Sequence, residues 1–423
     1  MFSAVVRNTI ATHVAAVAVL CACASPAASP GPPEGDVGDV GDVRDVEVRA
    51  LWVVRTSLTS PAAIAAMVSS ARAGSFNTLL VQVRGRGDAY YEGGVEPRPT
   101  TLSSQPSFDP LATAIARGHD AGLRVHAWIN INLVAGADLP SARGHVVRRH
   151  PEWVMVPRAI AGDLSRLDPH RPEFLARLAQ YVHDRPGEAE GLYLSPVNPA
   201  AADYTVAIVR DIAERYGVDG IHLDYIRYPD EDFDYGRETV AAFRASLVRD
   251  LGPSERGRYD ARRATDPLIY PRAFPERWRE FRADRLTALV ARLRAVVKRA
   301  RPSAVLSAAV APDADAAATH RLQDWRAWTA ANLVDVVCPM AYTTDASVFA
   351  AQVAAAGHVA GSHPVWAGIG AYRLSRAQIV DDVQTARRLG AGGIVLFSYD
   401  SLADPSRGPD FLARVGRAAF SSR

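Results

Sequence analysis

Short apolar runs rich in β-branched residues alternate with longer segments of helical periodicity along most of this chain. Eight runs have the length and composition of buried strands, and they lie at residues 50–54, 77–83, 124–129, 218–223, 304–309, 334–340, 364–368 and 393–397. Helical patterns follow them, for example at residues 61–73, 110–121 and 276–299. Such regular alternation implies a parallel sheet, and eight repeats favour a closed sheet over an open one. The pattern therefore predicts a (β/α)8 TIM barrel.

Two intervals between predicted strands are much longer than the others. Residues 130–199 follow strand three, and residues 228–274 follow strand four. In a barrel, segments that follow strands lie on the catalytic face, so we expect these insertions to shape a substrate cleft. No GxGxxG or Walker-type loop follows the first strand, which disfavours a nucleotide-binding fold.

The N-terminal part of the chain differs from the rest. A mostly apolar run from Ile10 to Leu20 is too short for a mature membrane span and is typical of a secretory signal. Ala22 precedes Cys23 as in a bacterial lipoprotein cleavage box, which predicts a signal peptide over residues 1–23 and lipidation of Cys23. A soluble exported protein cleaved near Ala28 is the alternative.

The chain is therefore predicted to consist of three segments: the signal peptide over residues 1–23, a flexible tether over residues 24–46 and the barrel over residues 47–423. The tether is rich in Pro, Gly, Ala and Ser and has too little apolar mass for a core. We therefore expect an exported protein of the cell envelope that touches the membrane through its lipid anchor only.

Net charge and cysteine content argue against a nucleic-acid partner and against a disulfide-stabilised fold. The formal charge of +2 gives no reason to expect a nucleic-acid partner. Lys298 is the only lysine, so arginine is the general cation of this chain and a single arginine carries weight only at a special position. Besides Cys23, only Cys338 would remain after processing, so no disulfide framework is expected. No cofactor is expected.

Polar and aromatic residues gather where the predicted strands end. In a barrel these ends meet around one basin, and aromatic faces with carboxylates, amides and guanidinium groups suit a carbohydrate. The residues predicted to bind substrate are Arg84, Asp88, Tyr90, Trp128, Asn130, His222, Arg227, Tyr342 and Tyr399.

Glycosidic cleavage usually needs two carboxyl groups. Asp224, at the end of the strand over residues 218–223, is the first candidate, unless it only forms an ion pair with Arg227 or Arg84. For the second carboxylate we select Asp345. The other candidates are Asp88, which could instead stabilise a turn, then Asp313 and Asp400.

A metal site is the competing interpretation of the same strand ends. His222 and Asp88, joined by His126 through the fold, could begin a zinc site of a deacetylase or amidohydrolase, but no second histidine lies at ligand spacing. We therefore expect no metal and interpret His222 as a neutral hydrogen-bonding residue.

Several segments together resemble the bacterial glycosyl hydrolase-like family 10. They are residues 49–53, 80–84 with 87–89, 122–130, 150–153, 193–199, 218–229 and 336–342. The resemblance spans roughly residues 47–420. It implies a TIM-barrel glycosidase of the cell envelope, often a lipoprotein, and at least some relatives act on peptidoglycan glycan strands stripped of their stem peptides.

The strand-four segment is also similar to the Asp-Gly-x-Asp-x-Asp-x-Glu signature of family-18 chitinases. Asp219 and Asp224 match the first and last Asp, but His222 replaces the middle one and Ile226 stands where the catalytic Glu would be. Their substrate-assisted mechanism therefore does not transfer, and the second catalytic group must come from another strand, unless Asp224 itself is the acid.

The function expected from the sequence is that of an exported glycoside hydrolase acting on an envelope or extracellular polysaccharide, with peptidoglycan glycan strands as partner. Asp224 and Asp345 are its expected catalytic pair. Two alternatives stay open: a non-catalytic glycan-binding barrel, which the missing Glu favours, and a metal-dependent polysaccharide deacetylase.

Overall fold

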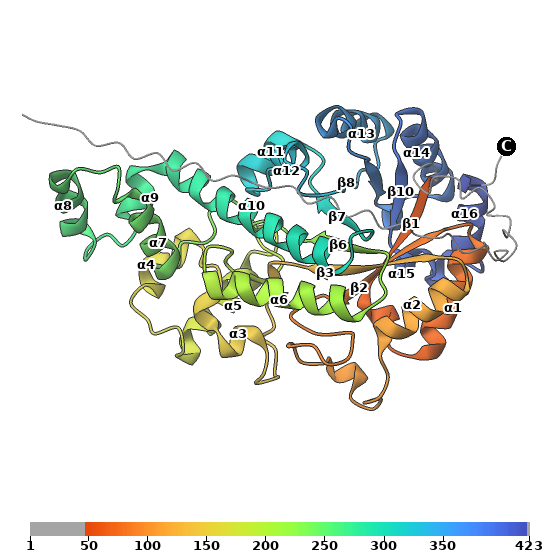
Figure 1. The fold of residues 1–423 in the computed structure, drawn as a ribbon, viewed down its shortest axis with the longest axis horizontal. Coiled ribbons are helices and arrows are strands. Elements are labelled where there is room, and N and C mark those ends of the chain that lie inside the picture. The colour runs from red at the N-terminus through yellow and green to blue at the C-terminus, as the bar shows by residue number, and fades with distance from the viewer. Residues whose placement is uncertain (1–46, 421–423) are drawn as a thin grey trace, which may run out of the picture. The chain divides into compact units, whose positions relative to one another are not determined.

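The computed structural model describes residues 47–420, and their centre is a closed barrel of eight parallel strands (Figure 1). The barrel strands are β1 (Val48–Val53), β2 (Thr78–Arg84), β3 (Arg124–Asn130), β6 (Gly220–Asp224), β7 (Val305–Val310), β8 (Val336–Ala341), β9 (Trp366–Ile369) and β10 (Gly393–Phe397). Each strand pairs with the next of this series, and β10 pairs with β1 to close the ring. The predicted TIM barrel is confirmed.

Helices pack around this barrel. Those that follow or precede its strands are α1 (Pro61–Ala73), α2 (Pro110–Asp120), α6 (Pro199–Arg215), α10 (Pro275–Ala300), α11 (Ala314–His320), α12 (Trp325–Ala330), α13 (Ala346–Ala360), α14 (Arg376–Arg388), α15 (Tyr399–Leu402) and α16 (Phe411–Phe420). The sequence sets several of their starts. Ser60 and Asn198, for example, cap α1 and α6 through their side chains, and a proline occupies the first position of each helix.

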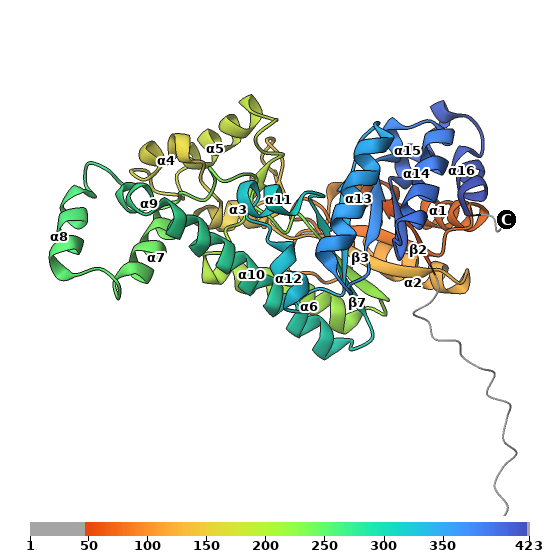
Figure 2. The same cartoon turned by 90° about the horizontal axis from the view of Figure 1, so that it is seen from above.

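Both long insertions lie where they were expected. The first, after β3, holds a two-stranded antiparallel sheet of β4 (Leu133–Ala135) and β5 (Leu192–Tyr193) with α3 (Val146–Arg149), α4 (Arg158–Leu164) and α5 (Pro172–Asp184). The second, after β6, forms α7 (Arg237–Leu247), α8 (Pro253–Arg262) and α9 (Ile269–Ala273). These three helices gather at the start of α10, away from the barrel strands (Figures 1 and 2).

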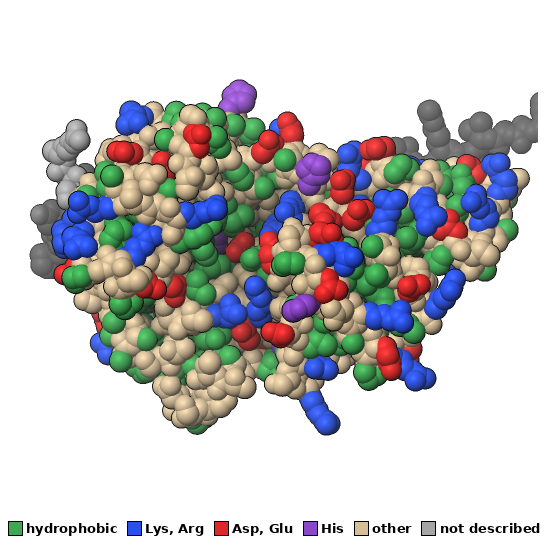
Figure 3. All heavy atoms as spheres, turned by 180° about the vertical axis from the view of Figure 1, so that it is seen from behind, with side chains coloured by type: hydrophobic (Ala, Val, Ile, Leu, Met, Phe, Trp, Pro, Cys, Tyr) green, Lys and Arg blue, Asp and Glu red, His purple; other side chains and the backbone are tan. Residues whose placement is uncertain are grey.

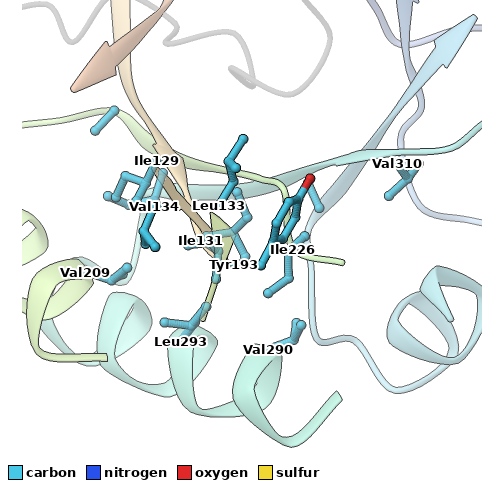
Figure 4. Packing of buried hydrophobic residues seen from close by; sticks show 14 of the residues in the cluster. Ile129, Ile131, Leu133, Val134, Tyr193, Val209, Ile226, Val290, Leu293 and Val310 are labelled. Atoms are coloured by element: carbon cyan, nitrogen blue, oxygen red, sulfur yellow. The ribbon is translucent and has the colours of Figure 1, made fainter. Parts of the chain in front are cut away.

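Two apolar clusters stabilise the fold. The smaller fills the inside of the barrel and includes Trp52, Trp128 and Trp366. The larger lies between the strands and the helices. Figure 4 shows part of it, where side chains of α6 and α10 such as Val209 and Leu293 pack beneath β3 and the first insertion. Apolar burial of this extent is the main force that holds the barrel together.

Two expectations concern regions beyond the barrel. The predicted signal peptide, tether and lipidation site Cys23 lie outside the described residues. Within residues 47–420, no helix is long and apolar enough to cross a membrane.

Candidate active site

A cavity of about 490 Å³ opens at the carboxyl ends of the barrel strands. Its wall combines aromatic, acidic and basic side chains. The lining residues are Trp52, Val54, Arg55, Gln82, Arg86, Trp128, Asn130, Glu190, Asp224, Tyr225, Arg227, Ala309, Ala311, Pro312, Arg321, Met340, Tyr342 and Phe397. Figure 3 shows one face of the molecule with a hollow where hydrophobic, acidic and basic side chains meet. Pockets of this size and mixed character bind small organic ligands or segments of polymers.

Asp224 is the last residue of β6, and only 8% of its surface is exposed. Its Oδ1 accepts a hydrogen bond from the Tyr225 backbone N–H (2.7 Å), and its Oδ2 accepts one from the Trp128 indole N–H (3.1 Å). Burial raises the pKa of the Asp224 carboxyl, against the opposing effects of these hydrogen bonds and of Arg227. A carboxyl group of this kind is suited to hold a proton and donate it.

Tyr225, directly after Asp224, has a left-handed backbone with φ of 49°. An aromatic residue adopts this conformation rarely, and such residues concentrate at functional sites. The Tyr225 carbonyl accepts a hydrogen bond from the backbone N–H of Asn132 (3.2 Å), which ties the turn to the first insertion. The turn therefore places the Asp224 carboxyl group and the Tyr225 ring on the cavity wall.

Glu190 supplies a second carboxylate from the first insertion, two residues before β5. It forms an ion pair with Arg227 (2.7 Å) and accepts a hydrogen bond from the Tyr193 hydroxyl (2.6 Å). Partial burial raises the pKa of Glu190, but the charge of Arg227 and these two hydrogen bonds outweigh burial and leave the pKa below its ordinary value. The cavity thus holds two carboxyl groups whose pKa values shift in opposite directions.

Aromatic rings form much of the remaining wall. Tyr342 stacks on Phe397 with ring centroids 5.5 Å apart, and Trp52 meets both rings edge-on. The Trp128 indole N–H is shared between Asp224 and the Asn130 side chain (3.0 Å). Sugar rings present C–H faces that pack on such aromatic surfaces, so the wall suits a carbohydrate.

A network of hydrogen-bonded polar side chains lies at the ends of β2 and β3 beside the cavity. The Gln82 amide donates to Asn130 Oδ1 (3.3 Å), and the Arg55 guanidinium donates to Gln82 Oε1 (3.0 Å). Asn130 in turn donates to the Gly85 carbonyl (2.9 Å). Since each of these side chains is fixed by another, the network orients the Trp128 indole toward Asp224.

The structure brings five of the predicted site residues together at the cavity. They are Asp224, Trp128, Asn130, Arg227 and Tyr342. The remaining six lie elsewhere.

Asp345 was selected as the second catalytic carboxylate, but the structure places it at the start of α13 instead of at the cavity. It caps α13, where its Oδ1 accepts hydrogen bonds from the backbone N–H groups of Ser347 (2.8 Å) and Val348 (3.1 Å). It is not among the residues that line the cavity. A polar residue that begins a helix after a strand produces the same sequence pattern as a catalytic strand-end acid. Asp313 likewise caps α11.

Arg84 and Asp88, predicted to bind substrate, stabilise the protein instead. The Arg84 guanidinium is fully buried and pairs in a bidentate manner with Glu96, both N–O distances being 2.7 Å. Asp88 accepts hydrogen bonds from the backbone N–H groups of Gly85 and Arg86, as the turn interpretation expected, and forms an ion pair with Arg55 (3.3 Å). Neither lines the cavity.

His222, Tyr90 and Tyr399 are also buried away from the cavity lining. His222 accepts a hydrogen bond from the Trp52 indole N–H (3.0 Å) and contacts the Ser307 hydroxyl (2.9 Å) inside the barrel. Burial lowers its pKa to about 3, so the ring is neutral and supports Trp52 from below. Tyr90 and Tyr399 pack in the larger apolar cluster.

Sequence reasoning missed several residues of the cavity. Glu190 lies within an insertion and had no strand-end position to mark it, and Arg321 lies just beyond α11. Arg86 follows the end of β2 by two residues, but it was not singled out among the polar residues there. Trp52 lies inside β1 and was part of a family segment, but was not assigned to the site. Among residues 47–420, no group of three or more His, Cys, Asp and Glu side chains could hold a metal ion.

Fold and cavity together define a (β/α)8-barrel protein with a pair of carboxyl groups in an aromatic cleft. The sequence model of the glycosyl hydrolase-like 10 family matches residues 47–186 and 163–365. The chain therefore belongs to this family.

Curated relatives support this membership. The chain is 27% identical over 160 residues to glycosyl hydrolase YngK of Bacillus subtilis, covering 36% of this chain and 25% of that protein. It is 24% identical over 163 residues to glycosyl hydrolase DigH of Escherichia coli, covering 35% of this chain and 30% of that protein. The matched region thus spans about a quarter to a third of the length of these relatives.

Solved structures share the fold. The glycoside hydrolase domain of PgaB (BpsB) from Bordetella bronchiseptica aligns with a TM-score of 0.60 at 16% identity, over 89% of this chain and all of that domain. The catalytic domain of β-amylase from Paenibacillus polymyxa aligns with a TM-score of 0.58 at 10% identity, over 89% of this chain and 98% of that domain. At such identities the likeness concerns the barrel alone.

Proposed function

We propose that this protein is an exported glycoside hydrolase that cleaves glycosidic bonds in the glycan strands of peptidoglycan. One observation carries the catalytic part of the proposal: Asp224 and Glu190 line the same cavity, and their pKa values are shifted apart. Two carboxyl groups with opposite shifts are the usual requirement for glycosidic cleavage.

Asp224 acts as the general acid in this proposal. Its raised pKa favours the protonated form, and the Trp128 and Tyr225 N–H groups fix its orientation. The proton passes to the glycosidic oxygen as the bond to the sugar carbon breaks, which neutralises the leaving group. The resulting Asp224 carboxylate is stabilised by the same two N–H groups.

Glu190 acts as the ionised partner. Arg227 and Tyr193 keep it in the carboxylate form. From there it serves either as nucleophile toward the sugar carbon or as base toward a water molecule; both roles need a negative charge close to the oxocarbenium-like transition state.

Aromatic and amide groups position the substrate. Trp128, Tyr342 and Phe397 offer ring faces and edges for sugar rings, and Asn130 and Arg227 offer hydrogen-bond donors. Burial raises the pKa of the Tyr342 phenol well above its ordinary value, so this group stays neutral and can donate its proton in a hydrogen bond.

The substrate and location rest on the sequence. The family resemblance of the sequence implies peptide-free peptidoglycan strands as the substrate, and the relatives YngK and DigH are named glycosyl hydrolases. The apolar run from Ile10 to Leu20 before Cys23 supports export and a lipid anchor at the cell envelope.

The proposal is tested by incubating the full-length protein with purified peptidoglycan from which all peptides have been removed. The expected result is soluble fragments with new reducing ends, identified by mass spectrometry. The same incubation with EDTA tests the alternative of a metal-dependent deacetylase. Loss of activity in EDTA, or release of acetate in place of new reducing ends, would favour that alternative.

A glycan-binding barrel without activity is the second candidate. The observation in its favour is that Ile226 stands where the chitinase signature has its catalytic Glu. Measurable affinity for the same strands, with no reducing ends after long incubation, would decide for this function and against hydrolysis.

A further inference from the structure

The cavity contains more positive charge than its own carboxylates balance. Four arginines line it. Arg55 is paired with Asp88 (3.3 Å) and Arg227 with Glu190 (2.7 Å). Within residues 47–420, no carboxylate oxygen lies within 4.0 Å of the side chains of Arg86 and Arg321. In the part of the chain that the structure describes, these two guanidinium groups therefore line the cavity without an acidic partner.

Arg321 is half-buried in an unfavourable electrostatic position. Burial lowers the pKa of its guanidinium, and the neighbouring Arg227 lowers it further, against weaker opposing effects of Glu190 and Asp230. Its backbone is fixed, because the Arg321 carbonyl accepts a hydrogen bond from the Tyr228 N–H (3.0 Å). A cation held beside a second cation costs free energy that an anionic group of a ligand would recover.

Arg86 lies in a closely packed turn just after β2. Its N–H donates to Asp88 Oδ1 (2.8 Å), and its carbonyl is bonded to the His145 ring (2.7 Å). Gly87 next to it has a φ of +68°, and a Cβ there would lie 2.6 Å from His145 Nε2, so the turn is closely packed. The turn leaves little freedom to the Arg86 backbone.

Tyr225 links this side of the cavity to the catalytic carboxyl group. The Arg86 Cζ lies 6.0 Å and the Arg227 Cζ 4.8 Å from the centroid of the Tyr225 ring. Tyr225 directly follows Asp224 in the chain. An anion bound by Arg86 would therefore belong to a sugar close to the bond that is cleaved.

We propose that the cleft recognises a carboxylate carried by the sugar units of its glycan, and that Arg86 and Arg321 provide this recognition. The inference rests on the proposed function, because it assumes that a glycan occupies this cavity. Guanidinium groups bind carboxylates in a planar, often bidentate geometry that neutral hydroxyl groups do not match. Two sources supply such a carboxylate: the lactyl group that is ether-linked to a hexosamine in peptide-free peptidoglycan, and the uronate unit of an acidic polysaccharide.

Binding measurements test this proposal without requiring cleavage. The Asp224→Asn variant of the full-length protein is titrated calorimetrically with two matched pairs: peptide-free peptidoglycan strands and hyaluronan, each with its carboxylates intact or reduced to alcohols. The acidic form of at least one pair should bind roughly tenfold to a hundredfold more tightly than its reduced form. The pair that shows the larger ratio identifies the source of the carboxylate.

Arginine variants complete the test. Arg86→Gln and Arg321→Gln, added to the same background, should each lower the ratio of affinities for acidic and reduced glycan. Arg376→Gln, at the exposed first position of α14, is the matched control and should leave the ratio unchanged. Thermal unfolding confirms that each variant is folded.

Equal affinity for both forms, or a preference that survives in the double variant Arg86→Gln/Arg321→Gln, would overturn the proposal. The proposed function fails separately. A wild-type protein that cleaves acidic and reduced strands equally well contradicts only the carboxylate recognition, whereas one that prefers acidic strands but cleaves neither contradicts only the hydrolase.

Discussion

At the scale of single residues, the surroundings of Asp224 and Glu190 shift the pKa values of these two carboxyl groups in opposite directions. Asp224 is enclosed by the barrel and has no arginine within ion-pair distance among residues 47–420, whereas Glu190 is held by Arg227 and Tyr193. Asp224 must be protonated and Glu190 ionised for the reaction. Activity should therefore fall below the pKa of Glu190 and above the pKa of Asp224, which gives a bell-shaped pH profile.

Replacing Arg227 by Gln should move the whole profile to higher pH. The Arg227 charge lowers the pKa of both Glu190 and Asp224, so its loss raises both values. The acidic limb, which Glu190 governs, then moves to higher pH, and the alkaline limb, which Asp224 governs, moves in the same direction. The measurement is kcat/KM for strand cleavage across the pH range.

Trp128→Phe is the matched comparison. It keeps an aromatic ring but removes the indole N–H that lowers the pKa of Asp224, so the alkaline limb should move to higher pH while the acidic limb stays in place. An unchanged profile in both variants would mean that neither carboxyl group controls the rate.

The sequence marked Asp224 because a buried strand ends there, and the same strand-end rule selected Trp128 and Asn130, which also line the cavity. The same rule selected Asp345 and Asp313, which cap the helices that follow their strands. Helix caps and catalytic acids share this place in a β–α unit, so the sequence pattern alone does not separate them. Glu190 lies within an insertion, and only the folded chain brings it to the barrel.

At the scale of secondary-structure elements, a buried ion pair joins the end of β2 to the loop between β2 and α2, and its arginine also bonds the start of the first insertion. Arg84 at the end of β2 pairs with Glu96 and also donates to the Ile131 carbonyl (2.9 Å), while Tyr204 of α6 donates to Glu96 (3.1 Å). Both charged side chains are fully buried. The pair therefore fixes the β2–α2 loop on the barrel, and Arg84 ties the first residues of the first insertion to the same site.

Arg84→Met should lower the free energy of unfolding by about 3–5 kcal/mol, because it leaves the Glu96 carboxylate buried without a partner. Urea denaturation measures this change. The double variant Arg84→Met/Glu96→Leu should recover a large part of the loss, since no charge then stays buried. A single variant as stable as the wild type would contradict the stabilising role of this ion pair.

Asp234 connects the first insertion to α7, because it accepts hydrogen bonds from Ser195 (2.6 Å) and Thr239 (2.9 Å). Burial raises its pKa to about 6 in the folded protein, against about 3.9 in the unfolded chain. The folded state therefore binds this proton more tightly, and its stability falls as the pH rises through the interval between the two values.

Asp234→Asn should remove this fall, which amounts to ~3 kcal/mol at most between about pH 4 and pH 6. Asparagine also tolerates the left-handed φ of 76° at this position. The free energy of unfolding of both proteins is measured at several pH values. Parallel curves for wild type and variant would show that Asp234 is not the group responsible.

At the scale of the whole molecule, the sequence predicted the architecture better than the site. Each of the eight strand runs became a barrel strand, and both long insertions follow β3 and β6. Strands and helices are encoded by local periodicity, which a single sequence displays directly. The cavity, in contrast, combines residues from strands, an insertion and the end of α11, and their proximity arises only when the barrel closes.

The predicted lipid anchor is a property of the whole chain and is tested by cell fractionation. The protein should be found with membranes and incorporate labelled fatty acid, whereas Cys23→Ser should not incorporate the label and should leave the membrane fraction. If the wild type is found in the soluble exported fraction without a lipid, the alternative of cleavage near Ala28 is correct.

The most direct test of the account compares fragments released from peptide-free peptidoglycan strands by four proteins. Wild type should release new reducing ends, and Asp224→Asn and Glu190→Gln should each lower kcat at least ~10²-fold while folding normally. Asp345→Asn, which keeps a helix-capping side chain, should stay as active as the wild type. Full activity of either Asp224→Asn or Glu190→Gln would contradict the proposed catalytic pair.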